Sequence, residues 1–156
     1  MYRDEFLDGD VLTNRLDLWR SRLSHDRQDQ FVYVAEADSH LLGFICAYGN
    51  ADPAWGSLID NLHVAYESGR SGIGTLLMQH AGAWLGSHYG QSGVYLWVLE
   101  ANQSARRFYE RLGAAHAGTV ESETPGGGSS RSCRCVWPSP EALRMRSHVL
   151  AHIKSI

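Results

Sequence analysis

Apolar and polar positions alternate along the chain in two periods, which separate helices from strands. Near the N-terminus, Asp10 precedes a stripe of Leu12, Leu16, Trp19 and Leu23 at helical spacing, which predicts a capped helix with one buried face. Later segments rich in β-branched and aromatic residues, bounded by turn residues, are typical of strands. The expected strands are Phe31–Ala37, Leu41–Tyr48, Ser57–Val64, Gly93–Leu99, His116–Glu123 and Arg131–Trp137.

Three further helices are expected between and after these strands. One begins after the glycines near residue 72 and runs to about His88, and a second occupies 100–114 with Gly113 as its stop. The first of these is expected to bury Ile73, Leu76, Leu77, Ala81, Trp84 and Leu85. A proline-initiated helix is expected from Pro140 to about Ile153. Mixed strands and helices in this order predict an α/β (α+β) fold.

Residues 62–75 combine the end of a strand, a glycine-rich turn and the start of a helix. The strand ends at Val64, and the pattern Gly69-x-x-Gly72-x-Gly74 opens the helix. Backbone N–H groups at a helix N-terminus lack intrahelical partners, and the helix dipole is positive there. Glycine at positions 72 and 74 lets an anion approach without meeting a Cβ atom. We therefore expect this segment to bind a phosphate-bearing ligand.

Two common phosphate-binding motifs do not fit this segment. A Walker loop ends in Gly-Lys-Ser/Thr, and the chain has no lysine before Lys154. The dinucleotide-binding fingerprint has the spacing Gly-x-Gly-x-x-Gly, which is the reverse of the spacing here.

Two motifs in the same order resemble those of the GCN5-related N-acetyltransferases. The strand, Val64 and Gly72-Ile73-Gly74 are similar to motif A, which holds the pyrophosphate of acetyl-CoA. Motif A usually reads Arg/Gln-x-x-Gly-x-Gly/Ala, whereas this chain has Gly69 first and Arg70 one place later, so the role of the cation passes to Arg70. The string Val-Leu-Glu-Ala-Asn-x-x-Ala-Arg-x-Phe-Tyr-Glu-Arg-Leu-Gly at residues 98–113 is similar to motif B. The resemblance covers roughly Phe31–Trp137.

This resemblance implies one domain over residues 1–156, with motif A at about 57–88, motif B at about 93–114 and the terminal helix at about 140–153. It implies a mixed, mostly antiparallel sheet with a splayed parallel strand pair and helices on both faces. The usual first strand is expected to be missing, because nothing before Phe31 alternates like a strand.

The resemblance also implies where acetyl-CoA binds. The strands ending at Val64 and Leu99 would splay apart, and ligand sites favour the carboxyl ends of parallel strands. The backbone at Leu62 and Val64 would pair with the pantetheine arm, and Asn102 would contact that arm. The expected cofactor-binding residues are Leu62, His63, Val64, Arg70, Ser71, Gly72, Ile73, Gly74, Thr75, Asn102 and Tyr109.

Direct acetyl transfer to an amine indicates the side chains that the reaction needs. A lysine-like amine has a pKa of about 10.4, so a carboxylate or an ordered water that takes its proton assists the attack. Asp60 or Glu100 could serve, since the position of the glutamate that some relatives carry is Trp97 here. Tyr109 can protonate the leaving thiolate. Each has an alternative: Tyr109 as a core residue, Asp60 as a solvated carboxylate and Asn102 as a helix cap.

The predicted function is that of an acetyl-CoA-dependent N-acetyltransferase, with a small-molecule or peptide amine as the acceptor. Two alternatives remain: a cofactor-binding or interaction module of the same fold that has lost turnover, and an acyltransferase that uses a longer acyl-CoA. Gly69 and Trp97 favour the first alternative, because each departs from the pattern of the family.

Composition indicates the class of protein, its cellular compartment and the ligands that it is not expected to bind. The chain has 156 residues, 44% of them apolar, and a net charge of −3, which is typical of one globular domain and offers no attraction for nucleic acid. No apolar run reaches the length of about 18 residues that a membrane span needs. Three cysteines cannot all pair, which favours the cytoplasm. No metal site is expected, because neither Cys133-x-Cys135 nor the pair His148 and His152 has further ligands.

The strand at Phe31–Ala37 is expected to lie at an edge of the sheet. Its residues are apolar on both faces, and an exposed apolar edge invites pairing with another chain. We expect a second copy of the chain, in a homodimer, or the terminal helix to cover it.

Overall fold

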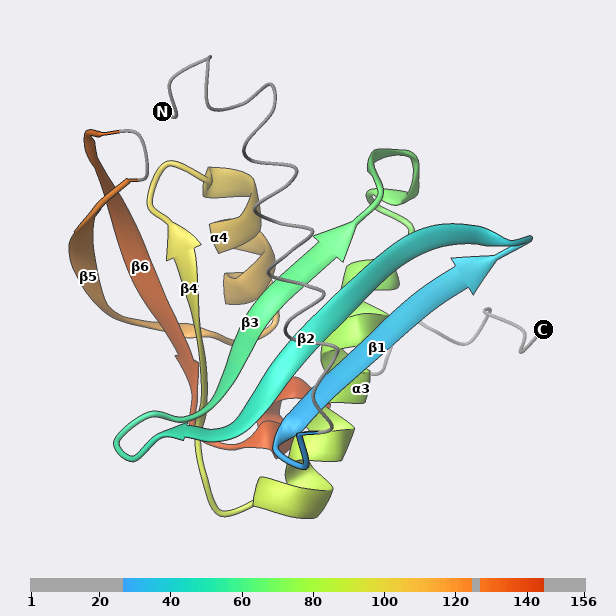
Figure 1. The fold of residues 1–156 in the computed structure, drawn as a ribbon, viewed down its shortest axis with the longest axis horizontal. Helices are drawn as coiled ribbons and strands as arrows, with labels where there is room; N and C mark the ends of the chain where they lie inside the picture. Colours follow the sequence, from blue (N-terminus) through green and yellow to red (C-terminus); the bar gives the residue numbers. More distant parts are fainter. Residues whose placement is uncertain (1–26, 125–126, 145–156) are drawn as a thin grey trace.

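The computed structural model describes residues 27–124 and 127–144, which form a six-stranded sheet with helices packed on it (Figure 1). The strand order across the sheet is β1-β2-β3-β4-β6-β5. Only β3 and β4 are parallel among these neighbours, so the sheet is mixed and mostly antiparallel. The strands are β1 (Gln30–Ala37), β2 (His40–Asp52), β3 (Gly56–Val64), β4 (Val94–Leu99), β5 (Ala115–Glu123) and β6 (Ser129–Trp137).

Helices α3 (Ile73–Tyr89) and α4 (Gln103–Arg111) cover the same face of the sheet. They bury their apolar faces in one core, where Leu77 of α3 and Tyr109 of α4 meet side chains of the central strands. Two short 3₁₀ helices, η1 (Tyr66–Ser68) and η2 (Pro140–Leu143), precede α3 and follow β6. The most deeply buried core residues are Ile45, Ala47, Leu77, Met78, Ala81, Leu85, Val94 and Trp137.

A β-bulge in β3 and an early end to its pairing with β4 shape the sheet. Cys46 of β2 pairs with Asn61 and the next residue, Ala47, pairs with Ile59, so Asp60 is an extra residue on β3. The parallel pairing of β3 with β4 is confined to two positions, Ser57 with Val94 and Leu58 with Tyr95. Beyond these positions the two strands diverge toward their carboxyl ends, as expected for the splayed pair.

The structure confirms the expected mixed sheet and all six expected strands, within two residues at most ends. The described helices α3 and α4 lie on one face, and the helices expected on the other face fall outside the described residues. The largest difference is β2, which continues to Asp52 rather than ending at Tyr48. The second expected helix is shorter, because Asn102 caps it and its first helical residue is Gln103. The helix expected from Asp10, the question of a first strand and the histidine pair at 148 and 152 lie outside the described residues.

Other expectations are met in part. The expected terminal helix begins as the 3₁₀ helix at Pro140–Leu143, and its remainder lies outside the described residues. The side chains of Cys133 and Cys135 share one face of β6 and are both buried as free thiols, as expected. Of the residues expected to be buried on α3, Leu77, Ala81 and Leu85 are fully buried.

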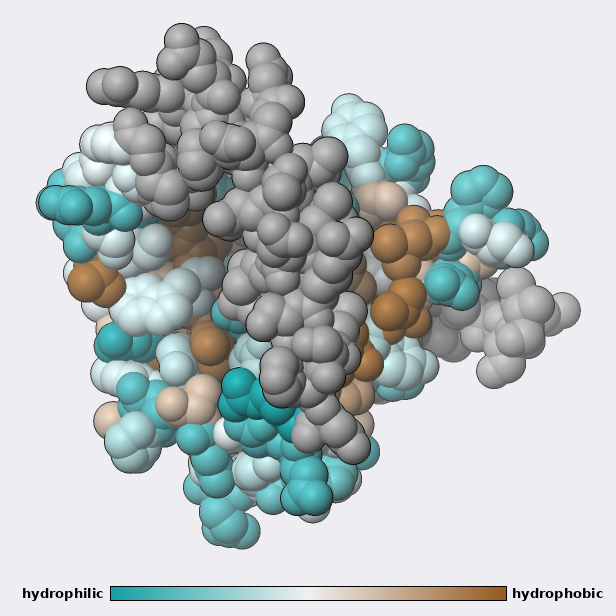
Figure 2. All heavy atoms as spheres, viewed as in Figure 1, coloured by the Kyte–Doolittle hydropathy of each residue, from teal (hydrophilic) through white to brown (hydrophobic). Residues whose placement is uncertain are grey.

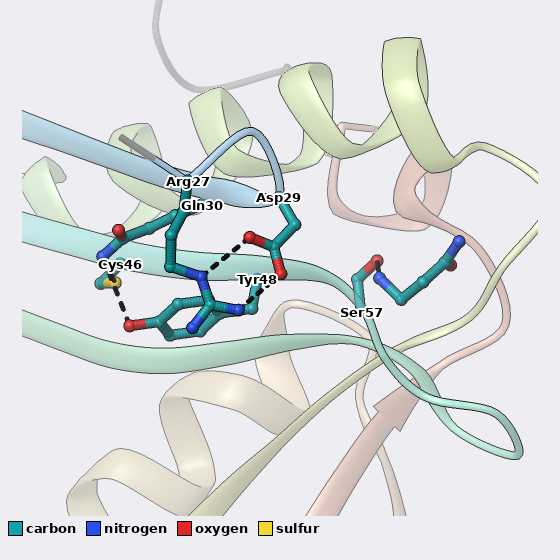
Figure 3. A network of polar contacts seen from close by, with 7 residues as sticks. Arg27, Asp29, Gln30, Cys46, Tyr48 and Ser57 are labelled. Atoms are coloured by element: carbon teal, nitrogen blue, oxygen red, sulfur yellow. Dashed lines mark hydrogen bonds and ion pairs between the residues drawn. The ribbon is translucent and has the colours of Figure 1, made fainter. Parts of the chain in front are cut away.

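The start of β1 is tied to β2 by a polar network (Figure 3). The Arg27 guanidinium donates from Nε and Nη2 to the Asp29 carboxylate, at 2.9 and 2.7 Å, and lies 5.1 Å from the centre of the Tyr48 ring. Gln30 donates from Nε2 to the Tyr48 hydroxyl at 3.3 Å. The hydrogen bonds from Arg27 lower the pKa of Asp29, although both side chains are exposed and such pairs contribute little to stability.

Strand β1 lies at one edge of the sheet formed by the described strands. Hydrophobic side chains gather over β1 and β2 on the face shown in Figure 2. Val34 and Leu41 are about half exposed there, at 46% and 53%. No helix among the described residues has the length and apolar character needed to cross a membrane.

Candidate active site

A cleft of about 240 Å³ opens where β3 and β4 diverge. Strand residues form its two walls, and the first two turns of α4 form its floor. Its lining residues are Ile59, Asp60, Asn61, Leu62, Leu96, Trp97, Val98, Leu99, Asn102, Ala105 and Tyr109. The bulge at Asp60 and the lost pairing beyond Leu58 create this cleft, because together they separate two neighbouring parallel strands.

The structure brings four predicted site residues together in the cleft: Asp60, Leu62, Asn102 and Tyr109. The backbone of β3 also supplies polar groups. Ala65 N–H donates to the Leu42 carbonyl on β2, and successive residues of a strand point their N–H groups to opposite edges. The N–H and C=O groups of Leu62 and Val64 therefore point away from β2 and toward the side where β4 has diverged.

The N-terminus of α3 adjoins the end of β3. A Cβ atom on Gly74 would lie 3.5 Å from Cγ2 of Val64, so the first turn of the helix rests against the last residue of the strand. The first backbone hydrogen bond of the helix is Leu76 N–H to the Gly72 carbonyl, at 3.0 Å. The preceding N–H groups, of residues 73–75, have no acceptor within the helix, no side chain caps them, and no acidic residue stands in the first turn.

The loop before α3 has an unusual backbone. Gly72 has a φ of 84°, which favours glycine, and Arg70 has a φ of 74°, a conformation that side chains with a Cβ rarely adopt. By contrast, Gly69 has a φ of −60° and a ψ of 132°, which any residue adopts. Strained backbone in a loop of this kind often accompanies a functional role. The Arg70 side chain is exposed, three residues before the first helical residue, Ile73.

Packing gives a second reason for glycine at position 74, besides the close approach of an anion that the sequence predicts. A Cβ atom there would stand 3.2 Å from Cζ of Phe108 on α4, closer than ordinary van der Waals contact. The predicted approach of a phosphate to Gly74 therefore coexists with a close contact between helices. Gly72 is required by its left-handed backbone.

Tyr109 lies on the buried face of α4 and is only 9% exposed. Its ring packs edge-on against Phe108 and Trp137, with centroid distances of 5.2 and 6.2 Å. Burial raises the pKa of its hydroxyl from 10.0 to about 12, with a smaller contribution from Cys135. Tyr109 is thus both a core residue and a residue of the cleft, so the two interpretations of the sequence are compatible.

Asn102 is the N-cap of α4, because its Oδ1 accepts a hydrogen bond from Ala105 N–H at 3.1 Å. The cap uses only Oδ1, and Asn102 also lines the cleft, where the sequence predicted contact with the cofactor arm. The His63 side chain instead packs against Phe44, with ring centroids 5.8 Å apart, and is not part of the cleft lining.

Sequence reasoning missed a stack of three side chains behind the cleft. The Arg134 guanidinium lies 4.1 Å from the centre of the Trp55 ring and 4.4 Å from that of Trp97. Trp97 itself lines the cleft. No local pattern signals the stack, because its members come from the β2–β3 loop, β4 and β6.

Two other features of the described residues were considered as candidate sites. A second hollow of about 470 Å³ lies beside the network of Figure 3, lined by Arg27, Asp29, Tyr48, Gly49, Asn50 and Ala51. Within residues 27–124 and 127–144, no three His, Cys, Asp or Glu side chains are grouped so that they could hold a metal ion.

The chain belongs to the acetyltransferase (GNAT) family, whose sequence model matches residues 2–114. Proteins of this family use acetyl-CoA. No curated protein matches the chain in a sequence search.

Solved structures with this fold share little sequence with the chain. Nourseothricin acetyltransferase has a TM-score of 0.65 at 23% identity, over 72% of this chain and 67% of that protein. The ribosomal-protein-S18-alanine N-acetyltransferase from Escherichia coli has a TM-score of 0.62 at 19% identity, over 77% and 76%. A Bacillus anthracis protein in complex with acetyl coenzyme A has a TM-score of 0.62 at 19% identity, over 75% and 67%.

Proposed function

We propose that this chain is an acetyl-CoA-dependent N-acetyltransferase that transfers the acetyl group directly to a primary amine. The observation that carries the proposal is the continuity of two features. A helix N-terminus with free N–H groups adjoins the end of β3, and β3 forms one wall of a cleft that contains Asp60 and Tyr109.

The residues present fit acetyl-CoA in two ways. The N–H groups of residues 73–75 and the Arg70 guanidinium would hold the pyrophosphate, because the helix N-terminus has a partial positive charge, the guanidinium has a full one, and no side chain caps this end of α3. The edge of β3 at Leu62 and Val64 would accept the pantetheine amides as an added strand would, since its N–H and C=O groups face the cleft. The Asn102 amide would donate to the same arm.

The chemical step requires three contributions from the chain. Asp60, directly or through a water molecule, would accept a proton from the ammonium form of the acceptor, so that the free amine forms its bond to the thioester carbon. A backbone N–H of β3 would stabilise the negative charge on the carbonyl oxygen. The carbon–sulfur bond then breaks, and Tyr109 would give its proton to the departing thiolate. The nitrogen loses its second proton as the amide forms, and that proton would return to Tyr109 through water, while the proton on Asp60 passes to solvent.

The raised pKa of Tyr109 changes how that last step is understood. With a pKa of about 12, the Tyr109 hydroxyl is a weaker proton donor than an exposed tyrosine, whose pKa is about 10. Its proton is also less readily given to a thiolate, because the corresponding thiol has a pKa of only about 8.5. Its main contribution would be a hydrogen bond to the sulfur as negative charge develops, with full proton transfer following as the bond breaks. The same burial keeps the hydroxyl protonated at every ordinary pH.

A second candidate is a cofactor-binding module with little turnover. Two observations favour it: Trp97 stands where some relatives have a glutamate, and Gly69 stands where the family has a cation. Both candidates predict acetyl-CoA binding, so only turnover separates them. Names of structural neighbours do not select the acceptor, since one is named for nourseothricin and another for an alanine of a ribosomal protein.

The test is calorimetric titration of acetyl-CoA followed by thiol release across a panel of amines, peptides and longer acyl-CoA donors. The proposal predicts binding, thiol release that depends on an amine, and a product that gains one acetyl group by mass. Asp60→Asn should retain binding and lose at least about tenfold in kcat, because general-base assistance is typically worth 10²–10⁴-fold. Binding without amine-dependent release would support the module, and absence of binding would refute both candidates.

A further inference from the structure

The Arg134 guanidinium contacts two indole rings on the sheet face opposite α3 and α4. Arg134 stands on β6 directly across from Trp97 of β4, and the second ring is that of Trp55 in the β2–β3 loop. Distances of 4.1 Å from the guanidinium carbon to the centre of the Trp55 ring and 4.4 Å to that of Trp97 fit cation–π contacts with both rings. The N–H donors of the guanidinium lie in its plane, so these contacts do not use them.

The donors of Arg134 are poorly satisfied. Nη1 reaches the Ala117 carbonyl at 3.4 Å, and the buried Nε has no hydrogen-bond partner. None of the carboxylates in the described ranges forms an ion pair with Arg134, whereas Arg131 on the same strand pairs with Glu100 at 3.2 Å. Unsatisfied buried donors are rare in folded proteins and often mark the place of a missing partner. Because Nε is closed to solvent, an acceptor from outside would reach the guanidinium through its Nη groups.

The stack adjoins the cleft through Trp97. Trp97 lines the cleft together with Asp60, and the Arg134 guanidinium lies 4.4 Å from the centre of its ring, just outside the cleft lining. Tyr95 lies two residues before Trp97 on the same face of β4. Burial raises the pKa of Tyr95, with smaller contributions from Asp52 and Asp60 in the same direction and from Arg134 in the opposite one.

We propose that Arg134 binds a carboxylate of the acceptor, so that the substrate class is amino acids and related amines that carry a carboxylate near the reacting nitrogen. This inference rests on the proposed function and deepens it. The planar guanidinium offers its N–H donors as a fork that matches a carboxylate, and the two indole rings limit how it can reorient. Asp60 would face the amine and Arg134 the carboxylate, which orients a zwitterionic acceptor by its two ends.

The inference is tested with acceptors that differ only by a carboxylate. Alanine with ethylamine, and lysine with cadaverine, are such pairs. The expected kcat/KM for the amino acid exceeds that for the plain amine by about tenfold to a hundredfold, because hydrogen bonds to charged groups are worth that much. Calorimetry of the same compounds with the CoA-saturated protein gives a second readout that does not depend on turnover.

Variants test whether Arg134 causes the preference for acceptors that carry a carboxylate. Arg134→Gln should bring the two members of each pair to within about threefold while acetyl-CoA affinity stays unchanged, and Arg134→Lys should keep only part of the preference because an ammonium has no planar fork. Arg131→Gln makes the same charge change on the same strand and should keep the full preference. Thermal unfolding shows whether each variant is folded.

Three outcomes would overturn the inference. The first is equal kcat/KM within each pair in the wild-type protein, which would leave the acetyltransferase function intact. The second is a preference that survives in a folded Arg134→Gln protein. The third is turnover of polyamines or peptides but of no amino acid. Failure of every amine would instead refute the proposed function.

Discussion

Gly74 of α3 faces the Phe108 ring of α4 at a distance that leaves little room for a side chain. A Cβ atom on Gly74 would lie 3.2 Å from Cζ of Phe108, so the ring or the helix would have to shift by a few tenths of an ångström. The two residues join the first turn of α3, which would hold the pyrophosphate, to the helix that carries Tyr109.

We predict that Gly74→Ala lowers the free energy of unfolding by about 1–3 kcal/mol, the usual cost of overpacking, and weakens acetyl-CoA binding with it. Gly86→Ala is the matched control on the same helix, because its Cβ would make only an ordinary 3.8 Å contact with Pro140. That change should be neutral or stabilise by about 0.5–1 kcal/mol. Urea unfolding and calorimetry measure both effects. If Gly74→Ala is destabilised as expected, adding Phe108→Leu should restore part of the lost free energy of unfolding. A Gly74→Ala protein of wild-type stability would show that the Phe108 ring does not restrict position 74.

Arg70 is expected to show opposite effects on stability and binding. Its φ of 74° is strained for arginine, so Arg70→Gly should raise the free energy of unfolding by about 1 kcal/mol. The same change removes the cation of the loop and should weaken acetyl-CoA binding by about tenfold at low salt. Arg70→Ala removes the charge and keeps the strain, so it should lose affinity without the gain in stability. Unchanged affinity of both variants would exclude Arg70 from the pyrophosphate site.

Tyr109→Phe should lower kcat by at least about tenfold with little change in acetyl-CoA affinity, since the ring is kept and the proton is lost. The wild-type kcat should not decline through ionisation of Tyr109 below about pH 11, because the pKa of Tyr109 is raised to about 12. A Tyr109→Phe protein with full kcat at every pH would assign the hydroxyl to structure alone.

The raised pKa of Tyr109 also predicts a pH dependence of stability. A group whose pKa is higher in the folded state stabilises fully below its unfolded value, about 10 here, and loses that contribution as the pH rises through about 12. The wild-type protein should therefore lose about 2–3 kcal/mol more than Tyr109→Phe over this range. Parallel unfolding curves of the two proteins between pH 9 and 12 measure the difference, and equal slopes would argue against the burial.

The edge at β1 should be covered in solution. Tyr33 and Val34 are 39% and 46% exposed on this edge strand, and an apolar edge of this kind tends to pair with another chain. We predict a homodimer by light scattering, slow hydrogen exchange along Gln30–Ala37, and dissociation in a Val34→Lys variant. Val120→Lys on β5, at the other edge and 44% exposed, should leave the dimer intact. A monomer with rapid exchange along β1 would contradict both the dimer and cover by the terminal helix.

Local patterns were sufficient for much of the fold. Strands such as Val94–Leu99 and helix α3 were predictable because burial of one face imposes a period of two or 3.6 on the sequence. Turns are also set by a few neighbouring residues. Asp38 and Ser39 both adopt positive φ in the turn between β1 and β2, which falls between two strands that the sequence predicts. The two family motifs indicated the class of protein for the same reason, since each lies within one strand, one turn and one helix.

Tertiary structure alone decided how distant segments meet. The bulge at Asp60 depends on the register between β2 and β3, and the stack of Trp55, Arg134 and Trp97 joins three segments far apart in the chain. The packing reason for Gly74 lies on another helix, at Phe108. No local period encodes such contacts, because their geometry follows from the packing of the whole sheet against its helices. The sequence by itself therefore determined the elements and the family, and the folded structure determined the cleft.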